Sequence, residues 1–430
     1  MNIKKYKTEY DVVVVGGGTA GAFAAIAAAQ TGAKTLIIEK NSMLGGTMTV
    51  CDINFPGLFF AWGKQIIDGP CWDIIKQTAE YGGAKIPEIT FKPQNHWDEQ
   101  IAFNKFVFLN FLNSRCKESG VDILTNAMIS DVCEQENAVQ LFVTCKEGIY
   151  SILTKKCIDA TGDANLVSIA GYGVKKSEIQ QPATLKNRIS GYDFDNVCVE
   201  DIKRAFSTAD FPDYVSEWRL ISWLQRHTID LHIPCAHADT SFGKTEVNLK
   251  AMSDLFNVFA FYKKIKGLEN ITVDYISMDT GIRETNRIVG EYEITADDYI
   301  TGRFFDDSVC YAFYPIDLHI MDGIKQEFHK ENIVAKVPYR ALIPKGTKNI
   351  LCAGRCISSD ALANSGLRVE AVCMATGQVA GCAAALAAKK NISVSEIDYH
   401  ELCGAVSVIG GIIPEGRQGT VLRLDRLKDL

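Results

Sequence analysis

The chain has 430 residues, 47% of them hydrophobic and 23% charged, which is typical of a globular protein with a large core and two or three domains. Its formal net charge of −7, without a basic block, argues against a nucleic acid partner, and the lack of any stretch of about 18 apolar residues predicts no membrane span. The 14 scattered cysteines contain no C-x-x-C pair and follow no secretory signal, so the sequence predicts free thiols and a cytoplasmic location.

Residues 11–39 predict the opening of a nucleotide-binding fold. The four valines at 12–15 suit a buried parallel strand, an alanine-rich helix is expected over residues 22–30, and a second strand over 35–38 stops at Glu39. Between the first strand and the helix stand Gly16, Gly18 and Gly21 in G-x-G-x-x-G spacing. A tight turn in another kind of α/β protein is the alternative.

Each part of this motif has a physical role in holding a dinucleotide. Gly16 allows a sharp turn, Gly18 lets a pyrophosphate approach the backbone, and Gly21 lets the helix pack closely on the strand. The helix start offers free N–H groups and a positive dipole to the phosphates. Glu39 is placed to accept hydrogen bonds from ribose hydroxyls, and its charge disfavours the extra phosphate of NADP.

Further elements follow in chain order. A glycine pair, Gly45 and Gly46, indicates a second close approach of backbone to ligand, with a plain turn as the alternative. Residues 55–95 form an aromatic-rich excursion with a helix at 70–81, and a second helix is expected at 104–119. Strands are expected at 122–125, 127–134, 139–146, 150–154 and 156–162, the last leading into a glycine turn and a short helix at 164–171.

Residues 175–336 differ in character, because aromatic residues cluster there and the alanine-rich helices stop. We expect a separate cap in this part, with strands at 271–278 and 308–316. From residue 337 the sequence again has the character of residues 1–174. Strands are expected at 338–343 and 349–354, and a long helix is expected to open at 364–368 and run to about 390. The sequence therefore predicts a discontinuous nucleotide-binding domain, 1–174 with 337–430, into which the cap is inserted.

Several segments resemble known flavoproteins. DVVVVGGGTAGAFAA with IIEK and GGT resembles the FAD-binding start of flavoproteins related to glutathione reductase, in the fumarate-reductase-like branch. GIRETNRIVGEY (281–292), YPIDLH (314–319), PYRALIPKG (338–346) and AGRCISSDALANSGLRVEAVCMATGQVAG (353–381) resemble the bacterial FAD-dependent oxidoreductase family. Asn286 stands where that family usually has an arginine. The resemblance implies an α/β fold, a Rossmann-like FAD-binding domain of the glutathione reductase type with an inserted α+β cap.

The resemblance also implies an extended FAD and names the residues that would hold it. A histidine near the glycine pair attaches FAD covalently in some members, and this chain has none there, so non-covalent FAD is expected. A helix start aimed at the flavin would stabilise the negative charge of the reduced ring. The implied FAD-binding residues are Gly16, Gly18, Thr19, Ala20, Gly21, Glu39, Lys40, Gly45, Gly46, Thr47, Met48, Ala127, Met128, Ala160, Thr161, Gly162, Asp163, Gly354, Arg355, Ser365, Leu367 and Arg368.

Catalytic candidates lie in the expected cap. Arg283, Glu284 and Arg287 form the best polar cluster there, and Arg283 and Arg287 would share a face if helical, giving a fork for a substrate carboxylate; a structural salt-bridge cluster is the alternative. His319 is a candidate acid or base, with a structural histidine as the alternative. The histidines, cysteine and aspartate within 227–239 match no zinc spacing, so no metal is predicted.

The expected function is an FAD-dependent oxidoreductase that transfers a hydride between flavin N5 and a small organic substrate, by dehydrogenation or C=C reduction. A flavin-binding protein with a structural or sensing role is the alternative, and an NAD-only dehydrogenase is a less favoured one. The expected partners are a small-molecule substrate and an unidentified electron donor or acceptor, with no nucleic acid and no membrane. A homo-oligomer is compatible with the sequence.

Overall fold

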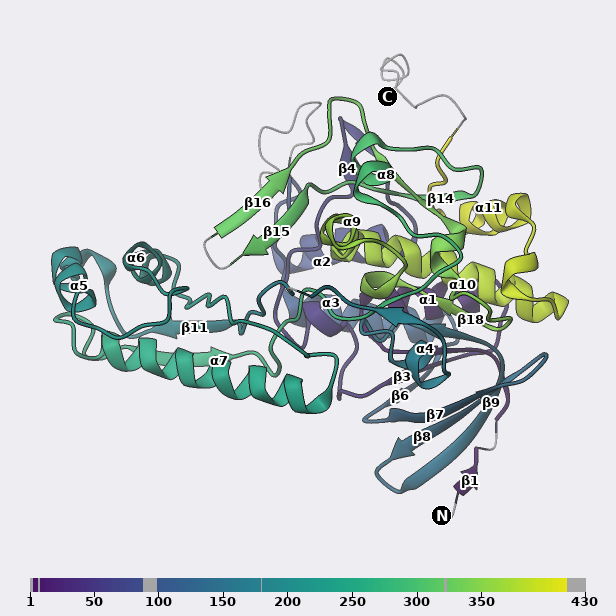
Figure 1. Ribbon diagram of the computed structural model, residues 1–430, viewed down its shortest axis with the longest axis horizontal. Helices are drawn as coiled ribbons and strands as arrows, with labels where there is room; N and C mark the ends of the chain where they lie inside the picture. The colour runs from purple at the N-terminus through teal and green to yellow at the C-terminus, as the bar shows by residue number, and fades with distance from the viewer. Residues whose placement is uncertain (1–2, 7, 88–98, 179, 321–322, 416–430) are drawn as a thin grey trace.

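The computed structural model describes residues 3–6, 8–87, 99–178, 180–320 and 323–415. Residues 88–95 of the expected excursion and residues 416–430 of the expected closing segment lie outside the described residues. The chain forms a main body from which an arm projects to one side, on the left of Figure 1.

A mixed sheet of eight strands lies in the main body. Its path runs β6 (Asp122–Thr125), β3 (Thr35–Glu39), β2 (Tyr10–Val15), β9 (Gly148–Asp159), β8 (Val139–Cys145) and β7 (Met128–Glu134), while β1 (Ile3–Lys5) and β18 (Ile350–Cys352) also pair with β9. The pairs from β6 to β9 and both added strands are parallel, whereas β7, β8 and β9 form an antiparallel meander. This confirms the predicted Rossmann-like α/β fold, since β2, apart from the half-buried Asp11, and β3 are buried parallel strands joined by one helix, and most of their residues are apolar.

Strand β9 joins what the sequence divides into two strands. Its first half, Gly148 to Thr154, pairs with β8, and its second half, Lys156 to Asp159, pairs with β2 and β18. Lys156, whose charge argues locally against a buried strand, donates a hydrogen bond from Nζ to Asn349 Oδ1 beside β18. The prediction of separate strands at 150–154 and 156–162 was wrong because this hydrogen bond to a residue far away in the sequence lets one strand continue through the polar residues.

Two helices from opposite ends of the chain pack together beneath the sheet. They are α1 (Thr19–Gln30) and α10 (Glu370–Lys390), and both are almost fully buried. A Cβ atom at Gly377 would lie 2.2 Å from the Ala20 carbonyl oxygen, and one at Gly381 would lie 2.2 Å from that of Ala24. Glycine is therefore required for this spacing, and the expected small-residue packing is confirmed. In the described part of the chain, α10 alone has the length and hydropathy of a membrane span, and it lies wholly within the core.

The rest of the main body surrounds these helices. Its helices are α2 (Pro70–Gly82), α3 (Lys105–Glu118), α4 (Asn165–Ile169), α8 (Ala296–Thr301), α9 (Ala361–Leu367) and α11 (Tyr399–Val408). Its short strand pairs are β4 (Phe60–Ala61) with β5 (Lys64–Gln65), β10 (Val174–Lys175) with β13 (Arg287–Ile288), β14 (Ser308–Ala312) with β17 (Ala335–Pro338), and β15 (Ile316–Ile320) with β16 (Gly323–Glu327). Residues 294–337 contribute to the same hydrophobic core as α1 and α10.

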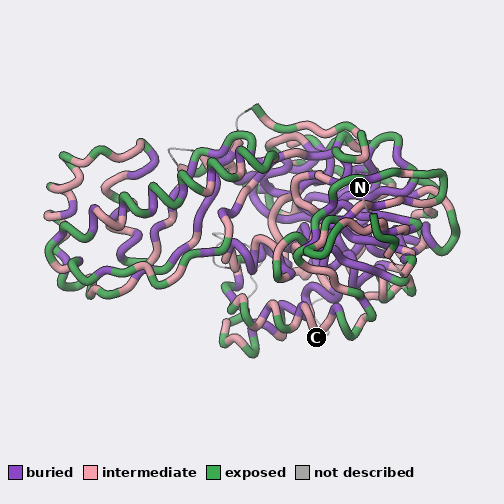
Figure 2. The backbone as a smooth tube through the Cα atoms, turned by 90° about the horizontal axis from the view of Figure 1, so that it is seen from below, coloured by how far each residue is buried: buried purple, intermediate pink, exposed green. Residues whose placement is uncertain are grey.

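The arm has its own hydrophobic core, made by side chains from Ala183 to Ile271. It consists of β11 (Asn187–Ser190), α5 (Val199–Phe206), α6 (Glu217–Gln225), α7 (Ser241–Tyr262) and β12 (Thr272–Ile276), with β11 antiparallel to β12. Figure 2 shows the buried interior of the arm separated from that of the main body. The limits 1–174, 175–336 and 337–430 stay a prediction for the domains.

Two local predictions near the closing end were wrong. The expected strand at 338–343 is the end of β17 followed by a 3-10 helix, Tyr339–Leu342, because Tyr339 turns away to donate a hydrogen bond to the Val394 carbonyl. The expected single helix from 364 to 390 is two helices, α9 and α10, separated by the extended residue Val369.

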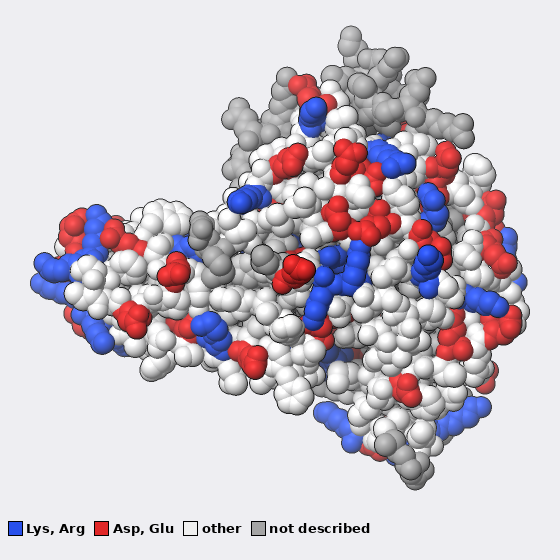
Figure 3. Space-filling model, in the orientation of Figure 1, with Lys and Arg blue, Asp and Glu red and all other residues white. Residues whose placement is uncertain are grey.

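Acidic and basic side chains are interspersed over the face shown in Figure 3, with both signs present on the arm and the main body.

Candidate active site

A cavity of about 1080 Å³ runs from the glycine turn after β2 to the root of the arm. Of the predicted cofactor residues, those along its wall are Gly16, Gly18, Thr19, Ala20, Glu39, Lys40, Gly46, Thr47, Ala127, Met128, Ala160, Thr161, Gly162, Asp163, Arg355 and Arg368. The remaining ones, Gly21, Gly45, Met48, Gly354, Ser365 and Leu367, lie behind that wall. The tertiary structure thus brings residues from both ends of the chain to one space.

The glycine turn has the shape that a pyrophosphate needs. A Cβ at Gly16 would lie 2.3 Å from the Ala160 carbonyl oxygen, and one at Gly21 would lie 1.8 Å from the carbonyl oxygen of Gly16. A Cβ at Gly18, by contrast, would meet only Gly46 Cα, at 3.9 Å, so the space in front of Gly18 is open to the cavity. No described side chain accepts a hydrogen bond as a cap at the start of α1, so the free backbone N–H groups there can bind an anionic group.

Glu39 ends β3 beside this turn and is held in place by the protein. Its Oε2 accepts a hydrogen bond from the Gly17 backbone N–H at 2.6 Å, and its Oε1 accepts from the backbone N–H and the Nδ2 of Asn41 at 2.8 and 2.7 Å. Each carboxylate oxygen can accept two hydrogen bonds, so acceptor capacity is left for a ribose hydroxyl. The Gly45 backbone pairs with Gly18, which places the second glycine turn against the first.

The middle of the cavity carries a fixed ion pair. Arg355 Nη2 lies 2.5 Å from Asp163 Oδ1, and Thr285 Oγ1 donates to the same carboxylate at 2.6 Å. Although burial acts against the cation, Asp163 raises the pKa of Arg355 above its usual value. The Arg355 guanidinium also lies against the turn at Gly162, where a Cβ would come within 2.9 Å of Nη2.

Helix α10, and not the expected start at Ser365, opens on the cavity. Ser365 lies inside α9, where its Oγ accepts a hydrogen bond from the Asp317 backbone N–H at 3.0 Å. Glu370, the first residue of α10, lines the cavity and accepts a hydrogen bond from Thr19 Oγ1. Burial raises the pKa of Glu370 to about 7. The sequence analysis missed Glu370 because it placed the helix start five residues too early.

Of the three catalytic candidates Arg283, Glu284 and Arg287, only Arg283 faces the cavity. Arg283 lines it and donates hydrogen bonds through Nη1 to the Pro182 carbonyl and, at 3.1 Å, to Thr184 Oγ1. Glu284 and Arg287 are buried away from it and form an ion pair, with 3.4 Å between Arg287 Nη1 and Glu284 Oε2. The segment is not helical, and Arg287 belongs to β13, so the expected shared face of Arg283 and Arg287 was wrong.

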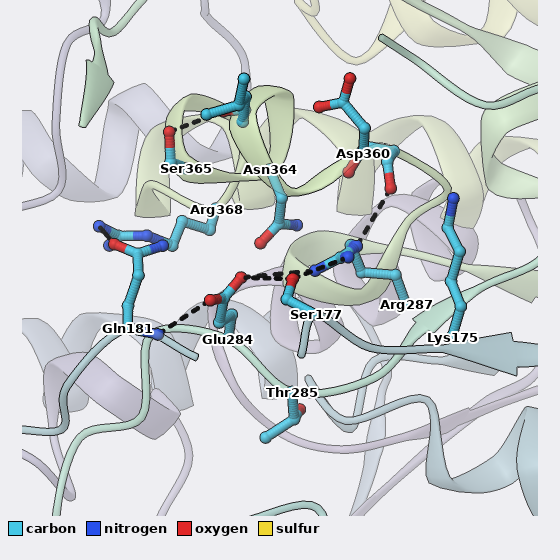
Figure 4. A network of polar contacts seen from close by, with 12 residues as sticks. Lys175, Ser177, Gln181, Glu284, Thr285, Arg287, Asp360, Asn364, Ser365 and Arg368 are labelled. Carbon is cyan, nitrogen blue, oxygen red and sulfur yellow. Dashed lines mark hydrogen bonds and ion pairs between the residues drawn. The ribbon is translucent and has the colours of Figure 1, made fainter. Parts of the chain in front are cut away.

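The Glu284–Arg287 pair is fully enclosed by hydrogen bonds, as Figure 4 shows. Glu284 Oε1 accepts from the Gln181 backbone N–H at 2.9 Å, and Arg287 Nε donates to the Ser359 carbonyl at 3.0 Å. Ser177 Oγ bridges the two side chains, at 3.4 Å from Glu284 and 3.2 Å from Arg287. These contacts tie β13 to the segment before α9 and to residues 177–181, and they favour the structural alternative for this pair.

At the far end of the cavity, two arginines and two histidines come together around one carboxylate. His319 Nε2 lies 3.0 Å from Asp317 Oδ2, and Arg368 Nη2 lies 3.7 Å from the same atom. The ring of His232 packs edge-on against that of His319, with 5.3 Å between centroids. Arg283 stands near this group and lowers the pKa of both histidines electrostatically.

The charge of this cluster is set by burial and by its neighbours. Burial lowers the pKa of His319 to about 4, although Asp317 raises it, and burial with Arg283 lowers that of His232 to about 3. Burial opposes ionisation of Asp317, but His319 and Arg368 lower its pKa to about 2. Burial lowers the pKa of Arg283 to about 9, so it stays protonated at neutral pH. The cluster therefore combines two cations and one anion with two neutral histidines.

Several polar atoms here have no hydrogen-bond partner among the described residues. They are Nδ1 of His232, Nδ1 of His319 and Nε of Arg368, all on cavity-lining side chains. A buried polar atom without a partner costs about 1–3 kcal/mol, so these three atoms mark a part of the cavity wall whose polar groups the described residues leave unsatisfied. Neither Asp317 nor His232 was predicted as a site residue from the sequence, where His232 was considered only in the metal hypothesis for residues 227–239 that was set aside. Among the described residues, no three His, Cys, Asp or Glu side chains form a metal-binding group.

Comparisons with known proteins agree with this geometry. A family model described as FAD dependent oxidoreductase matches residues 11–406. The chain is 27% identical over 184 residues to a thiamine thiazole synthase of Methanococcus vannielii, covering 40% of this chain and 64% of that protein. It is 26% identical over 213 residues to a digeranylgeranylglycerophospholipid reductase of the same organism, covering 46% of this chain and 52% of that protein.

A solved structure of a geranylgeranyl bacteriochlorophyll reductase-like protein from Thermoplasma acidophilum is 16% identical, with a TM-score of 0.42, and the match covers 95% of this chain and 84% of that one. The match spans less than two thirds of the curated relatives named above. The family model, by contrast, spans almost the whole chain and includes both ends of the cavity. The protein belongs to the FAD-dependent oxidoreductase family.

Proposed function

We propose that this protein transfers a hydride between N5 of non-covalently bound FAD and a small organic anion held by the arginine–histidine cluster. One observation carries the proposal: a single cavity joins the glycine turn to the cluster of Arg283, Arg368, His232 and His319. The residues along the cavity fit FAD, because the open space at Gly18, the uncapped start of α1 and Glu39 suit its adenosine diphosphate. When bound, FAD supplies the redox chemistry.

The protein's own residues bind and orient the substrate. Arg283 and Arg368 against the single carboxylate of Asp317 leave one net positive charge, which favours an anionic substrate. Two guanidinium groups suit a carboxylate because each presents several N–H donors in a fixed plane. Arg283 takes the carboxylate-binding role that the sequence predicted for Arg283 and Arg287, and Arg368 takes the place of Arg287 in this role.

His319 is placed to move the proton that accompanies hydride transfer. Its Nε2 is held by Asp317, and its side chain lines the cavity together with Arg283 and Arg368, which places the ring beside a bound substrate. An anionic substrate beside the ring would raise the pKa of His319 from about 4 towards neutrality, where a histidine is an efficient acid and base. A second substrate, an electron donor or acceptor, completes the turnover.

Non-covalent attachment is supported by the residues near the second glycine turn. That loop holds Thr47 and Met48, and the nearest nucleophile along the cavity is the Cys51 thiol. Burial raises the pKa of Cys51 to about 12, so the thiol stays protonated and a poor nucleophile. All 14 cysteines are free, which supports a reducing, cytoplasmic setting. Placement in the fumarate-reductase-like branch is proposed on the motifs alone.

The test is a screen of small organic acids for bleaching of the oxidised flavin band under anaerobic conditions. We expect at least one acid to reduce the flavin, or to reoxidise a chemically reduced flavin, and Arg283→Ala and His319→Ala to slow that step by about tenfold or more. Arg340→Ala, which removes a surface arginine paired with Asp307, is the matched control. A flavin inert to every acid favours the non-catalytic alternative, and unchanged rates in both cavity variants would remove these residues from the mechanism. Acid precipitation should release the FAD.

A further inference from the structure

One face of α7 carries an exposed apolar seam on the projecting arm. The exposed fractions of its side chains are 88% for Phe242, 67% for Leu249, 44% for Met252 and 65% for Phe256. The opposite face of the same helix, including Val247, Ala251, Leu255 and Val258, is buried in the core of the arm. Since α7 is apolar on both sides, the packing of the arm accounts for one face and leaves the seam without a partner in the described chain.

The seam follows the spacing of a coiled coil. Its positions are Phe242, Thr245, Leu249, Met252, Phe256 and Phe259, separated alternately by three and four residues over nearly the whole helix. Thr245 is its one polar member, and Phe259, at the far end, is half-buried and packs partly on the core of the arm. This is the 3.5-residue period at which the a and d positions of two helices interlock. A helix that only covers a globular core has no need of this second, regular seam.

We propose that the protein forms a symmetric dimer in which α7 packs antiparallel against α7 of a second copy. About a two-fold axis next to residues 250 and 251, Phe242 lies opposite Phe259 of the other copy, Thr245 opposite Phe256, and Leu249 opposite Met252. Every a position then meets a d position, so the seam is complementary to itself, as an isologous interface requires.

The charges along the seam fit a second copy better than a lipid surface. The exposed residues beside it include Ser241, Glu246, Ser253 and Asn257, and Lys250 is paired with Asp254 at 3.2 Å. The exposed lysines Lys263, Lys264 and Lys266 lie beyond the end of the helix, where Lys263 donates a hydrogen bond to the Glu269 carbonyl. A membrane-binding helix would instead be flanked by free lysines and arginines. In the antiparallel register the two copies of Glu246 lie roughly 14 Å apart along the axis, beyond the range of strong repulsion in physiological salt.

The exposed area of the seam reaches the lower limit for a specific interface, about 1,000 Å² in total. Aromatic side chains bury roughly 150–250 Å² each, so the exposed parts of two phenylalanines, a leucine and a methionine supply roughly 500 Å² per copy, or about 1,000 Å² in the pair. Figure 1 shows α7 along one edge of the arm, running from the root of the arm towards its tip. The first turn of α7 adjoins the cavity through Thr240, Ser241 and Lys244. In the dimer, the arm tip of each copy therefore lies beside the cavity of the other.

The experiment is sedimentation equilibrium of the full chain with bound FAD at micromolar concentrations. We expect the wild type to be a dimer, and Leu249→Glu with Phe256→Glu to weaken the dimer by about 100-fold or more, because each buried side chain is lost twice in a symmetric pair. Val408→Glu, at a similarly exposed apolar residue on α11, is the control and should stay dimeric. Circular dichroism and flavin content establish that the variants are folded.

A mixing experiment tests the register. When Phe242→Cys and Phe259→Cys proteins are mixed and mildly oxidised, a disulfide-linked dimer should form in the mixture and not in either variant alone, with wild type as the control for the exposed native cysteines Cys133 and Cys198. A monomeric wild type, a dimer that survives the double glutamate substitution, or cross-linking within each variant alone would overturn the proposal. A monomer that binds anionic phospholipid vesicles through α7 would overturn it in favour of a lipid surface.

Discussion

Replacing Arg287 with methionine measures what the buried Arg287–Glu284 pair contributes to the fold. Arg287 is 4% exposed and Glu284 is 2% exposed, so bulk water reaches neither charge. Methionine keeps an unbranched aliphatic side chain but no charge, so Arg287→Met leaves the Glu284 carboxylate buried without a cation. Removing one partner of a buried ion pair costs about 3–5 kcal/mol. Because Glu284 keeps hydrogen bonds from Gln181 and Ser177, we expect the lower end, about 3 kcal/mol.

The double variant Glu284→Gln/Arg287→Met separates charge from packing. A glutamine oxygen can still accept the Gln181 hydrogen bond, and no buried charge is left, so more than half of the lost stability should return. The assay is urea unfolding followed by circular dichroism, with the transition of the main body compared between variants, because the arm has its own core and can unfold separately.

Neither side chain lines the cavity, so the rate of flavin reduction per folded protein should not change in these variants. A single variant that loses less than about 1 kcal/mol, or a double variant as unstable as the single one, would refute the buried-charge reasoning. A large loss of flavin reduction in folded protein would refute the structural assignment of Arg287.

Two further predictions concern the cofactor end of the cavity. The raised pKa of Glu370, about 7, means that the protonated side chain favours the folded state at acid pH, and that this stability is lost as pH rises through about 7. Between pH 5 and 8, the free energy of unfolding of the wild-type apoprotein should therefore fall by up to about 3 kcal/mol relative to that of the Glu370→Gln apoprotein, and screening by water in the cavity reduces this amount. A difference in urea midpoints between the two proteins that does not change with pH would contradict this. Gly21→Ala, whose Cβ would lie 1.8 Å from the Gly16 carbonyl oxygen, should lower the thermal midpoint of the apoprotein. Gly18→Ala should leave the thermal midpoint of the apoprotein unchanged and reduce the FAD retained by the holoprotein; equal effects of the two substitutions on both readouts would argue against the open cradle at Gly18.

The opening motif was predictable because its signals are local. A buried parallel strand needs a run of β-branched residues, a tight turn needs glycine, and both lie within residues 11–39. The close approach of α1 and α10 was also readable, since Gly377 and Gly381 leave room for another backbone. The break between α9 and α10 was not predictable, because no proline or glycine marks Arg368 or Val369.

Sequence by itself determined the nucleotide-binding fold and most residues along the FAD end of the cavity, because these depend on backbone shape that a few residue types impose. Only the tertiary structure decided which arginines serve the site. Nothing in the sequence distinguishes the role of Arg283 from that of Arg287, yet Arg283 turns to the cavity and Arg287 is held by Glu284, Ser177 and Ser359. Arg368 reaches the site from the break between α9 and α10, far away in the sequence. The direction of a charged side chain is set by the partners that satisfy it, and those partners come together only when the chain has folded.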